Sequence, residues 1–574
     1  MSDFNLDPNE LLFVPLGGCG EIGMNLNLYG LGGKWLMVDL GVTFGDDSMP
    51  GIDVAMPDPA FIVERRDDLL ALVVTHAHED HLGAVPYLWR QLRCPVYVTA
   101  FAAEYLQLKL EEVGLADIVP VHIVCDGDTL DIGPFNVTYH SITHSIPESH
   151  ALAIRTPLGN ILHTGDWKLD PEPGLGEATN PQPFTDFGRE GVLAMVCDST
   201  NVFLEGTSGS ESEVRDSLIE IVGRAKQRVA ITTFASHVAR LKTLIDVAAA
   251  HDRNVVLVGR SLLRATTAAR NVGYLDDGVV FVPEREAGLI PADKCLVICT
   301  GCQGEPRAAL SKIAFRSHKH VALDEGDMVI FSSKIIPGNE SGIAAVQNRL
   351  VHSGVEVITE QDEFVHVSGH PARDELAQMY GWVRPKISIP VHGEARHLAE
   401  HASFARSLQV PDAFVLENGA AIRLAPGKPA IVDYVEAGRL YRDGDRLIRP
   451  DSEIVRDRRK LARAGSVAVI VVMKSSGRLA VLPRIVSYGV TDSGIETERE
   501  IGRTLAATVT SAIEKLPTLT RRDDEKLEEA IRRAVRGCLK GTTGTRPLID
   551  VEIVRIPTNR GTQIGSDDKR TEEV

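Results

Sequence analysis

The stretch Thr75-His76-Ala77-His78-Glu79-Asp80-His81 restricts what this chain can fold into more than any other part of it. It follows an apolar run, residues 69–74, that is short, rich in Leu and Val, and predicts a buried strand. Residues 82–88 predict the start of a helix, which places the histidines in a strand-to-helix loop at the edge of a sheet. Because His and Asp are common ligands of zinc and similar ions, this stretch indicates a metal site. A polar surface loop with chance histidines is the alternative interpretation.

The spacing His76-x-His78-x-Asp80-His81 after an apolar strand resembles the signature of the metallo-β-lactamase superfamily. That superfamily builds a dinuclear metal site on an αββα sandwich. The resemblance implies further site residues at strand ends, and a carboxylate placed like that of Asp166 can bridge two ions about 3.5–4 Å apart. A capping role is the alternative for Asp166. The residues implied are Asp39, expected to support the metal loop by hydrogen bonds without binding metal, His144, selected over the more structural His140 and His150, and Asp166.

Length and composition limit the number of domains, the partners and the cellular location that are expected for this chain. The chain has 574 residues, enough for several domains, and a net charge of −18, which would repel a polyanion. Nucleic acid would therefore need a local basic or metal-lined groove. Eight scattered cysteines are expected to be reduced, as in the cytosol. Residues 1–5 lack a leader pattern and no run of about 18 apolar residues occurs, so no membrane span and a cytoplasmic location are expected.

A dinucleotide-binding motif is the competing interpretation of the N-terminal region. Residues 18–23 fit G-x-G-x-x-G, and Asp39 follows at a suitable distance. That fold requires a helix directly after the glycines. Instead, residues 24–29 alternate and residues 34–39 continue as another apolar run, which favours a β-meander.

The segment Asp198-Ser199-Thr200-Asn201 resembles the first motif of the β-CASP group, the nucleic-acid-cleaving branch of the superfamily. From about residue 206 the chain alternates between helices and short apolar strands, which predicts a parallel, doubly wound inserted domain. The helices are expected at 211–225 and 241–250, and the strands at 228–233, 254–258, 279–282, 295–300 and 328–331. Loops 234–238, 301–306 and 332–340 follow such strands, where ligands bind in open α/β sheets, and they resemble loops of the ribonuclease J family.

Two late histidines complete the resemblance. Residues 365–370 resemble the second β-CASP motif and residues 389–397 the third. By this resemblance His392 is a ligand of the second metal, and His370 donates a proton to the leaving group. Either histidine alone would be interpreted as structural.

The C-terminal part predicts a small α+β unit, with a hairpin at 466–473 and 479–486, helices at 496–515 and 523–539, and a last strand at 549–556. It resembles the C-terminal domain of ribonuclease J, which is linked to self-association. The basic run 456–460 is expected to be a solvated face. The domains expected are a metallo-β-lactamase domain at 1–205 and 366–445, a β-CASP domain at 206–365, a linker at 446–465, the α+β domain at 466–557 and a disordered tail at 558–574.

The resemblance implies a metal-dependent ribonuclease that hydrolyses RNA phosphodiesters as a 5′-to-3′ exonuclease, prefers 5′-monophosphate ends, allows endonuclease cleavage, and serves RNA maturation and decay. His76, His78 and His144 would hold one ion, and Asp80, His81 and His392 the other, with Asp166 between them. The imidazole-rich set suits Zn²⁺, with Mn²⁺ as the alternative. Asp198 would orient His370. The residues expected to bind substrate are Ala235, Ser236, His237, His366, Val367, Ser368, Gly369 and His370.

The implied partners are single-stranded RNA, copies of the same chain in a homodimer or homotetramer formed through the C-terminal domain, and RNA-decay proteins. Two other functions share parts of these motifs. A small-molecule hydrolase of the superfamily would have the metal loop but would not need an insertion of about 150 residues, far longer than an ordinary loop. A non-catalytic RNA-binding scaffold would be expected to have lost ligands that this sequence retains.

Overall fold

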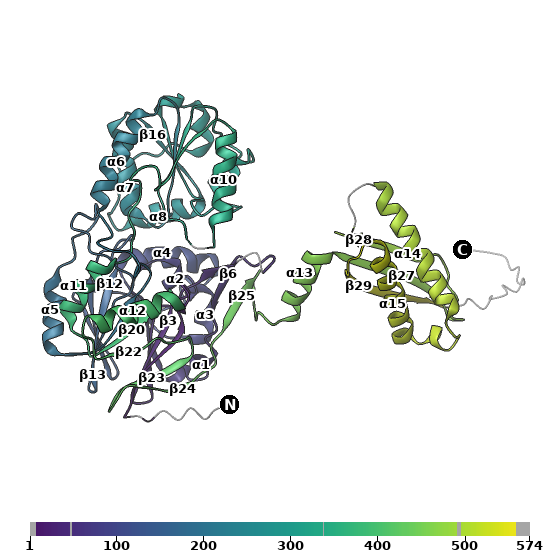
Figure 1. Ribbon diagram of the computed structural model, residues 1–574, viewed down its shortest axis with the longest axis horizontal. Coiled ribbons are helices and arrows are strands. Elements are labelled where there is room, and N and C mark those ends of the chain that lie inside the picture. The colour runs from purple at the N-terminus through teal and green to yellow at the C-terminus, as the bar shows by residue number, and fades with distance from the viewer. Residues whose placement is uncertain (1–6, 8, 46–48, 337, 491–494, 558–574) are drawn as a thin grey trace, which may run out of the picture. The chain divides into compact units, whose positions relative to one another are not determined.

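The computed structural model describes residues 7, 9–45, 49–336, 338–490 and 495–557 (Figure 1). It divides into two compact units, residues 1–44 with 54–440 and residues 45–53 with 441–574. The expected disordered tail, 558–574, and residues 1–5, where no leader is expected, lie outside the described residues. Among the described residues, no helix combines the length and the apolar character needed to cross a membrane.

Two sheets form the centre of the first unit, in the strand orders β24-β23-β1-β3-β4-β7-β8-β9 and β10-β11-β12-β13-β14-β20-β22. Their strands are β1 (Leu11–Gly17), β3 (Leu26–Leu31), β4 (Lys34–Val38), β7 (Leu69–Val73), β8 (Val96–Val98), β9 (Val121–Ile123), β23 (Ala420–Ala425) and β24 (Ala430–Tyr434), then β10 (Thr129–Ile132), β11 (Phe135–Ser141), β12 (His150–Thr156), β13 (Gly159–His163), β14 (Val192–Asp198), β20 (Ile387–Val391) and β22 (Asp412–Ala413). Short strands also occur as β2 (Cys19–Gly20), β5 (Thr43–Phe44), β6 (Val54–Pro57) and β21 (Gly393–Glu394).

The two sheets face each other across a shared apolar core, with Phe13 and Leu36 from the first sheet and Phe135 and Ile154 from the second. Each fully buried side chain of this size contributes about 1.5–3 kcal/mol. Helices cover the outer faces, which gives the predicted αββα sandwich. They are α1 (Ala60–Val63), α2 (Glu79–Leu82), α3 (Val85–Leu92), α4 (Ala100–Glu112), α5 (Pro181–Glu190), α11 (Arg373–Val383) and α12 (Ala395–Ser407).

The glycine-rich N-terminal stretch forms the predicted β-meander. β1 pairs with β3, and β3 with β4, both antiparallel, so a strand and not a helix follows the glycines. A Cβ at Gly17 would lie 1.8 Å from the Met24 carbonyl oxygen, so only glycine permits this close turn. The dinucleotide-binding interpretation is therefore wrong for residues 18–23.

A second domain is inserted between two neighbouring strands of the sandwich. β14 and β20 pair directly in parallel, with Asp198 opposite Val391, and the inserted residues leave and return at this edge (Figure 1). The inserted sheet is wholly parallel, in the order β16-β17-β15-β18-β19. Its elements are α6 (Glu211–Arg224), β15 (Val229–Thr232), α7 (Val238–Ala250), β16 (Asn254–Val258), α8 (Arg260–Asn271), β17 (Cys295–Cys299), α9 (Ala309–Ala314), β18 (Met328–Phe331), α10 (Glu340–His352) and β19 (Glu356–Ile358).

The chain starts this sheet at β15, adds the edge strand β16 and then β17 between them on one side, and adds β18 and β19 on the other side. The carboxyl ends of β15 and β18 therefore flank a topological switch point, where open α/β sheets bind ligands. The strand predicted at 279–282 is wrong. Only Val282 forms a bridge there, to Val256, and Val280 is 81% exposed, so the run has no partner strand to cover it.

The second unit contains a three-stranded sheet, β28-β27-β29, in which β27 pairs antiparallel with β28 and parallel with β29. Alternate β27 residues, among them Val469 and Val471, pack against α14 and α15 in one core. The second hairpin strand starts at Arg484 rather than 479, because Pro483 cannot donate a ladder hydrogen bond and Leu482 is exposed. The elements are β25 (Arg439–Asp443), β26 (Arg446–Ile448), α13 (Glu453–Ala464), β27 (Ser466–Lys474), β28 (Arg484–Tyr488), α14 (Ile495–Lys515), α15 (Asp524–Thr542) and β29 (Leu548–Ile556).

Two buried ion pairs lie where the inserted domain joins the sandwich. Lys168 Nζ is 2.7 Å from Asp170 Oδ2, and Arg240 binds both carboxylate oxygens of Glu211 at 3.0 Å. The pairs are connected, because the Asp170 carboxylate also accepts the Glu211 backbone N–H at the start of α6.

Replacing Asp170 with Ala should leave the Lys168 ammonium group buried without its counter-charge. We expect the free energy of unfolding of the first unit to fall by about 3–5 kcal/mol, measured by urea denaturation. Asp186→Ala, which breaks an exposed pair with Arg189, is the control and should cost no more than about 1 kcal/mol. Equal losses in the two variants would contradict the importance given to the buried pair.

Candidate metal centre

Three histidine rings converge on one point at the edge of the sandwich. His76 and His78 lie in the loop after β7, and His144 lies after β11. His78 Nδ1 is 3.1 Å from His76 Nε2 and 3.0 Å from His144 Nε2. Three nitrogens around a tetrahedral zinc ion, each at about 2.0–2.1 Å from it, would lie about 3.3 Å apart. The rings are therefore spaced closely enough to hold one ion.

A second set of donors lies beside the first. His81 Nε2 and His392 Nε2 lie 3.1 and 3.3 Å from Asp166 Oδ2, and both lie 3.7 Å from Asp80 Oδ2. The Asp80 carboxylate thus completes a group of two rings and two carboxylates. Within the described part of the chain, Nε2 of His392 is buried and has no hydrogen-bond partner, which suits a ligand atom.

Asp166 connects the two sets through a single oxygen. Its Oδ2 atom also lies 4.0 Å from Nε2 of both His76 and His144. Burial would raise the pKa of Asp166, but the rings of His392 and His81 outweigh it and hold the pKa well below its usual value. Asp166 is therefore an ionised, buried carboxylate between two groups of donors, and the clusters are compatible with a dinuclear metal site.

The protonation of the first set also suits metal binding. Burial is the largest influence on His76, His78 and His144, and it lowers the pKa of each ring, that of His78 to about 4. The rings are neutral at pH 7, and neutral imidazole is the form that binds metal.

Hydrogen bonds fix the orientation of His81 and His144 on the side of each ring that faces away from the other donors. Nδ1 of His81 donates to Asp39 Oδ2 at 2.7 Å, and Nδ1 of His144 donates to the Gly369 carbonyl at 2.6 Å. Asp39 also accepts from the Thr75 backbone N–H at 2.8 Å, so it contacts the loop that it was expected to support. Such contacts set which ring nitrogen is free to bind an ion.

Sequence reasoning did not identify two of these supports. The Asn25 side-chain amide lies 2.9 Å from His392 Nδ1 and 3.1 Å from His81 Nε2, and it donates to the Asp80 carbonyl. The Gly369 carbonyl was also missed, because that residue was assigned to substrate binding only. Both contacts join residues far apart in the sequence, and no local pattern indicates them.

His370 lies beside the donor sets and pairs with Asp198. Its Nδ1 is 2.8 Å from Asp198 Oδ2 and 3.9 Å from Asp166 Oδ2. Burial alone would lower the pKa of His370, but the charge and hydrogen bond of Asp198 outweigh it, with help from Asp166 and Asp80. The pKa rises to about 9. The ring is therefore protonated at neutral pH and can release a proton from Nε2 while Nδ1 stays bound.

The expected substrate-binding residues fall into two groups. The 366–370 segment lies at the metal centre, where Asn201 donates to Ser368 Oγ at 2.6 Å and to the His370 carbonyl at 3.0 Å. The residues after β15 are half-buried at Ala235 and Ser236, whereas His237 is buried, with Nε2 3.2 Å from Glu211 Oε1.

His140 and His150 take no part in the donor sets. His140 lies on β11 with its ring against Phe184, and His150 begins β12 with Nδ1 2.8 Å from the Glu148 carbonyl. Neither is a member of any group of potential ligands found among the described residues.

Comparison with known proteins defines the class first. The "Metallo-beta-lactamase superfamily" profile matches residues 25–223, and that of the "Zn-dependent metallo-hydrolase RNA specificity domain" matches 354–409. A solved protein of unknown function from Enterococcus faecalis V583 shares the fold, with a TM-score of 0.51 and 16% identity over 72% of this chain and all of its own. The sandwich is thus that of a metallo-β-lactamase-type metallo-hydrolase, and its donor sets are compatible with a dinuclear metal site.

The family follows from closer relatives. "Ribonuclease J, beta-CASP domain" matches residues 226–350, and "Ribonuclease J C-terminal domain" matches 453–556. Ribonuclease J of Sinorhizobium meliloti is 46% identical over 95% of this chain and 98% of its own length, and that of Thermus thermophilus is 35% identical over 93% and 94%. The chain belongs to the ribonuclease J family.

Substitutions in the donor sets should remove ions selectively. His76→Ala should lose the ion of the first set and His392→Ala that of the second, whereas Asp166→Ala, which lies between them, should lose both. Plasma emission spectroscopy on purified, zinc-loaded protein gives the metal content per chain. His140→Ala is the matched histidine control and should keep the wild-type content. Unchanged metal in the Asp166 variant would refute its bridging position.

Proposed function

We propose that this member of the ribonuclease J family, a metal-dependent ribonuclease, degrades single-stranded RNA from its 5′ end, prefers 5′-monophosphate ends, and also makes endonucleolytic cuts. The observation that carries the proposal is the pairing of two donor sets on Asp166, with His370 next to them and hydrogen-bonded to Asp198. Such a centre supplies what phosphodiester hydrolysis needs, namely a site for metals and an acid for the leaving oxygen.

Seven residues of the chain are the proposed metal ligands. His76, His78 and His144 would hold one ion, Asp80, His81 and His392 the other, and Asp166 both. When bound, the ions would lower the pKa of water and stabilise negative charge on the phosphate oxygens. The imidazole-rich donor set favours Zn²⁺, with Mn²⁺ as the alternative.

His370 would serve as the general acid. Its hydrogen bond to Asp198 fixes the ring and leaves Nε2 as the proton that can be transferred to the departing oxygen. Asp198 is itself held, because its Oδ1 atom accepts from the Thr200 backbone N–H at 2.9 Å and from the Thr200 hydroxyl at 2.8 Å. The acid is therefore positioned before substrate arrives.

A 5′-terminal phosphate would bind where the 366–370 segment passes the switch point of the inserted sheet. In the described part of the chain, Nδ1 of His366 and Nδ1 of His237 are buried without a hydrogen-bond partner, whereas Nε2 of His237 faces Glu211 Oε1 at 3.2 Å. Arg240 lies against the same segment, donating to the Val365 carbonyl at 3.1 Å. The charge of Arg240 is already paired with Glu211, so the ring nitrogens of His366 and His237 that lack a partner are the groups that would donate to a phosphate. A triphosphate would bring further charge that a closed pocket must desolvate.

The remaining proposals concern the domain limits, the partners, the location and the cellular role of the protein. The domain limits 1–205, 206–365, 366–445 and 466–557 remain our working division. Self-association through the C-terminal unit would give a homodimer or homotetramer, and RNA-decay proteins are further partners. The seven cysteines of the first unit are free thiols, which supports a cytoplasmic location. RNA maturation and decay is the proposed role.

The direct test is an RNA with one sequence and two 5′ ends, at one stated salt concentration. We expect 3′-labelled single-stranded RNA to be shortened from the 5′ end, faster with a monophosphate than with a triphosphate, and not at all after chelation of the metal. Ser236→Ala with His366→Ala should reduce the preference between ends while metal content stays constant. If the wild type degrades the monophosphate and triphosphate RNAs at equal rates, the proposed 5′-phosphate pocket is wrong and the protein is better described as an endonuclease.

His370→Ala tests the general acid separately from the metals. Because His370 belongs to neither ion's proposed ligand set, the variant should keep both ions yet lose on the order of 10²–10⁴ in rate, the usual range for general acid catalysis. Single-turnover cleavage and metal analysis on the same preparation give both values. His352→Ala, at an exposed helix end, is the control. Wild-type turnover in the His370 variant would mean that another group supplies the proton.

A further inference from the structure

Helix α4 of the sandwich and helix α8 of the inserted domain lie along each other (Figure 1). Three polar pairs cross between them or just beyond their ends. Arg264 binds Glu112, Asn271 Nδ2 donates to Glu104 at 2.8 Å, and the Tyr274 hydroxyl donates to Glu148 at 2.9 Å. We call these three pairs the α4–α8 seam.

The first end of the seam reaches the metal loop through Glu79. This residue stands between His78 and Asp80 but belongs to neither donor set. Its carboxylate instead accepts from the Tyr105 hydroxyl at 3.2 Å and pairs with the buried Lys109, both on α4. Arg264 of α8 also interacts with the Tyr105 hydroxyl. A continuous set of contacts thus joins the inserted domain to the loop that carries four proposed ligands.

The second end reaches the other ligand loops through Glu148. Its Oε2 atom accepts the Phe101 backbone N–H at the start of α4, at 2.7 Å, while Oε1 accepts from Tyr274. Glu148 has a φ of 58°, which is strained for a residue with a side chain, so these contacts must hold it in place. The next residue, Ser149, donates to the Asp166 carbonyl at 3.1 Å.

From these contacts we propose that Glu79 and Glu148 are positioning residues that couple the docking of α8 on α4 to the geometry of both ion sites. The inference rests on the proposed metal-dependent function, because it concerns how that centre is held. Glu79 fixes the His78–His81 loop, and Glu148 fixes the loops of His144 and Asp166. When the inserted domain parts from the sandwich, Glu148 loses Tyr274 directly, whereas Glu79 keeps its α4 partners but Tyr105, which donates to it, loses Arg264. Both carboxylates then hold the ligand loops less firmly.

The physical properties of the seam suit a contact that opens and closes. Glu112 is 61% exposed, and pairs of this kind contribute only about 0–1 kcal/mol. By contrast, Lys109 is 7% exposed and keeps Glu79 on α4 when α8 moves away. The seam can therefore part while each domain stays folded. Coupling of this kind is reciprocal, so metal binding would also favour the docked arrangement.

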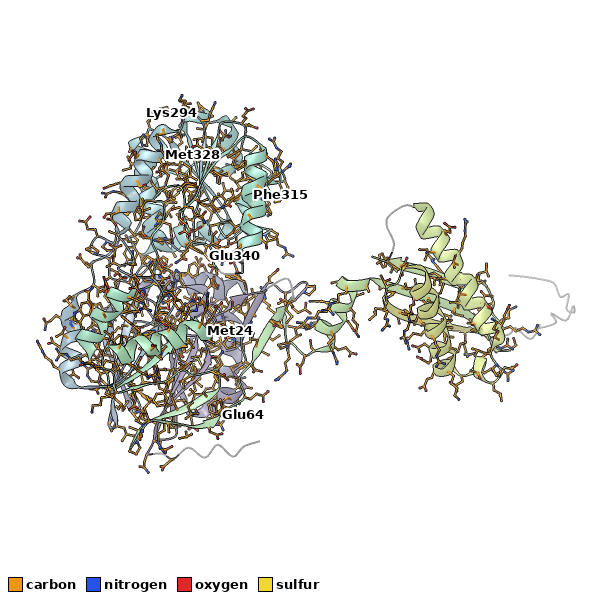
Figure 2. All side chains as sticks on the ribbon, viewed as in Figure 1. Met24, Glu64, Lys294, Phe315, Met328 and Glu340 are labelled. Atoms are coloured by element: carbon orange, nitrogen blue, oxygen red, sulfur yellow. The ribbon has the colours of Figure 1, made fainter. Side chains whose placement is uncertain are left out.

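The test uses variants of the inserted domain that touch no proposed ligand. Full-length protein carrying Arg264→Met and Tyr274→Phe is loaded with Zn²⁺ and mixed with excess chromogenic chelator, without RNA. We expect zinc to leave about three- to tenfold faster than from the wild type, the scale of typical coupling effects. Lys294→Met breaks a comparable ion pair with Asp252 elsewhere on the inserted domain (Figure 2) and should release zinc at the wild-type rate.

A second variant tests the path through Glu79. Lys109→Met removes the α4 partner of Glu79 and should also speed release. Combined with Arg264→Met, it should give less than the product of the two separate accelerations, because both act on one path. If the two accelerations of zinc release simply multiply, Lys109 and Arg264 act independently, and the proposed path through Glu79 is wrong.

Hydrogen exchange on metal-free protein supplies a readout that needs neither zinc nor activity. The Arg264→Met and Tyr274→Phe protein should exchange faster at residues 76–82 and 144–150, whereas the Lys294→Met control should not. Wild-type zinc release and wild-type exchange in the double variant would overturn the inference, whatever its activity. Failure to cleave RNA in the wild type would instead overturn the proposed function and leave the release result standing.

Discussion

The buried carboxylate of Asp166 is the constraint on which the centre depends. Four of the other donors, His76, His144, His81 and His392, lie within 4.0 Å of its Oδ2 atom, which is buried together with these rings. An ionised carboxylate in such a place is costly unless cations or donors compensate it. The first three rings are neutral, and Asp39, Asp80 and Asp198 add further acidic groups nearby. The site therefore has an excess of ligand oxygens and nitrogens over cationic groups, an imbalance that divalent ions would correct.

The strand ends of the sandwich place the donor residues around this carboxylate. β7, β11, β13, β14 and β20 each end next to a residue of the centre, so elements separated by up to hundreds of residues supply one edge. The long insertion does not disturb this edge, because β14 and β20 pair directly across it. Even the left-handed backbone of His392, with φ 53°, is fixed there, since its N–H donates to the Gly18 carbonyl at 2.7 Å.

The sequence predicted the residues whose chemistry is rare at strand ends. The clustered residues of the 76–81 stretch indicated a metal site by themselves, whereas His144, Asp166 and His392 followed from the resemblance to the superfamily. The alternation of helices and strands indicated the inserted sheet. The sequence could not predict Asn25 beside His392 or the Gly369 carbonyl on His144, because these contacts span 367 and 225 positions. An apolar run in the sequence also does not show whether another layer of the structure covers its side chains. Val280 and Leu482 lie in segments predicted as strands that have no covering layer.

The 365–370 segment explains how an acidic chain can act on RNA at a fixed place. Its first carbonyl, at Val365, is bound by Arg240 and by Ser332 Oγ of the inserted domain, the latter at 2.8 Å. Its last residues contact His144 and Asp198 of the sandwich. One short segment therefore spans from the switch point of the inserted sheet to His370, the proposed general acid. With a net charge of −18, long-range attraction cannot bring RNA to the enzyme. In the proposed function, fixed local donors select the phosphate instead, and this segment would set their distance from the cleavage site.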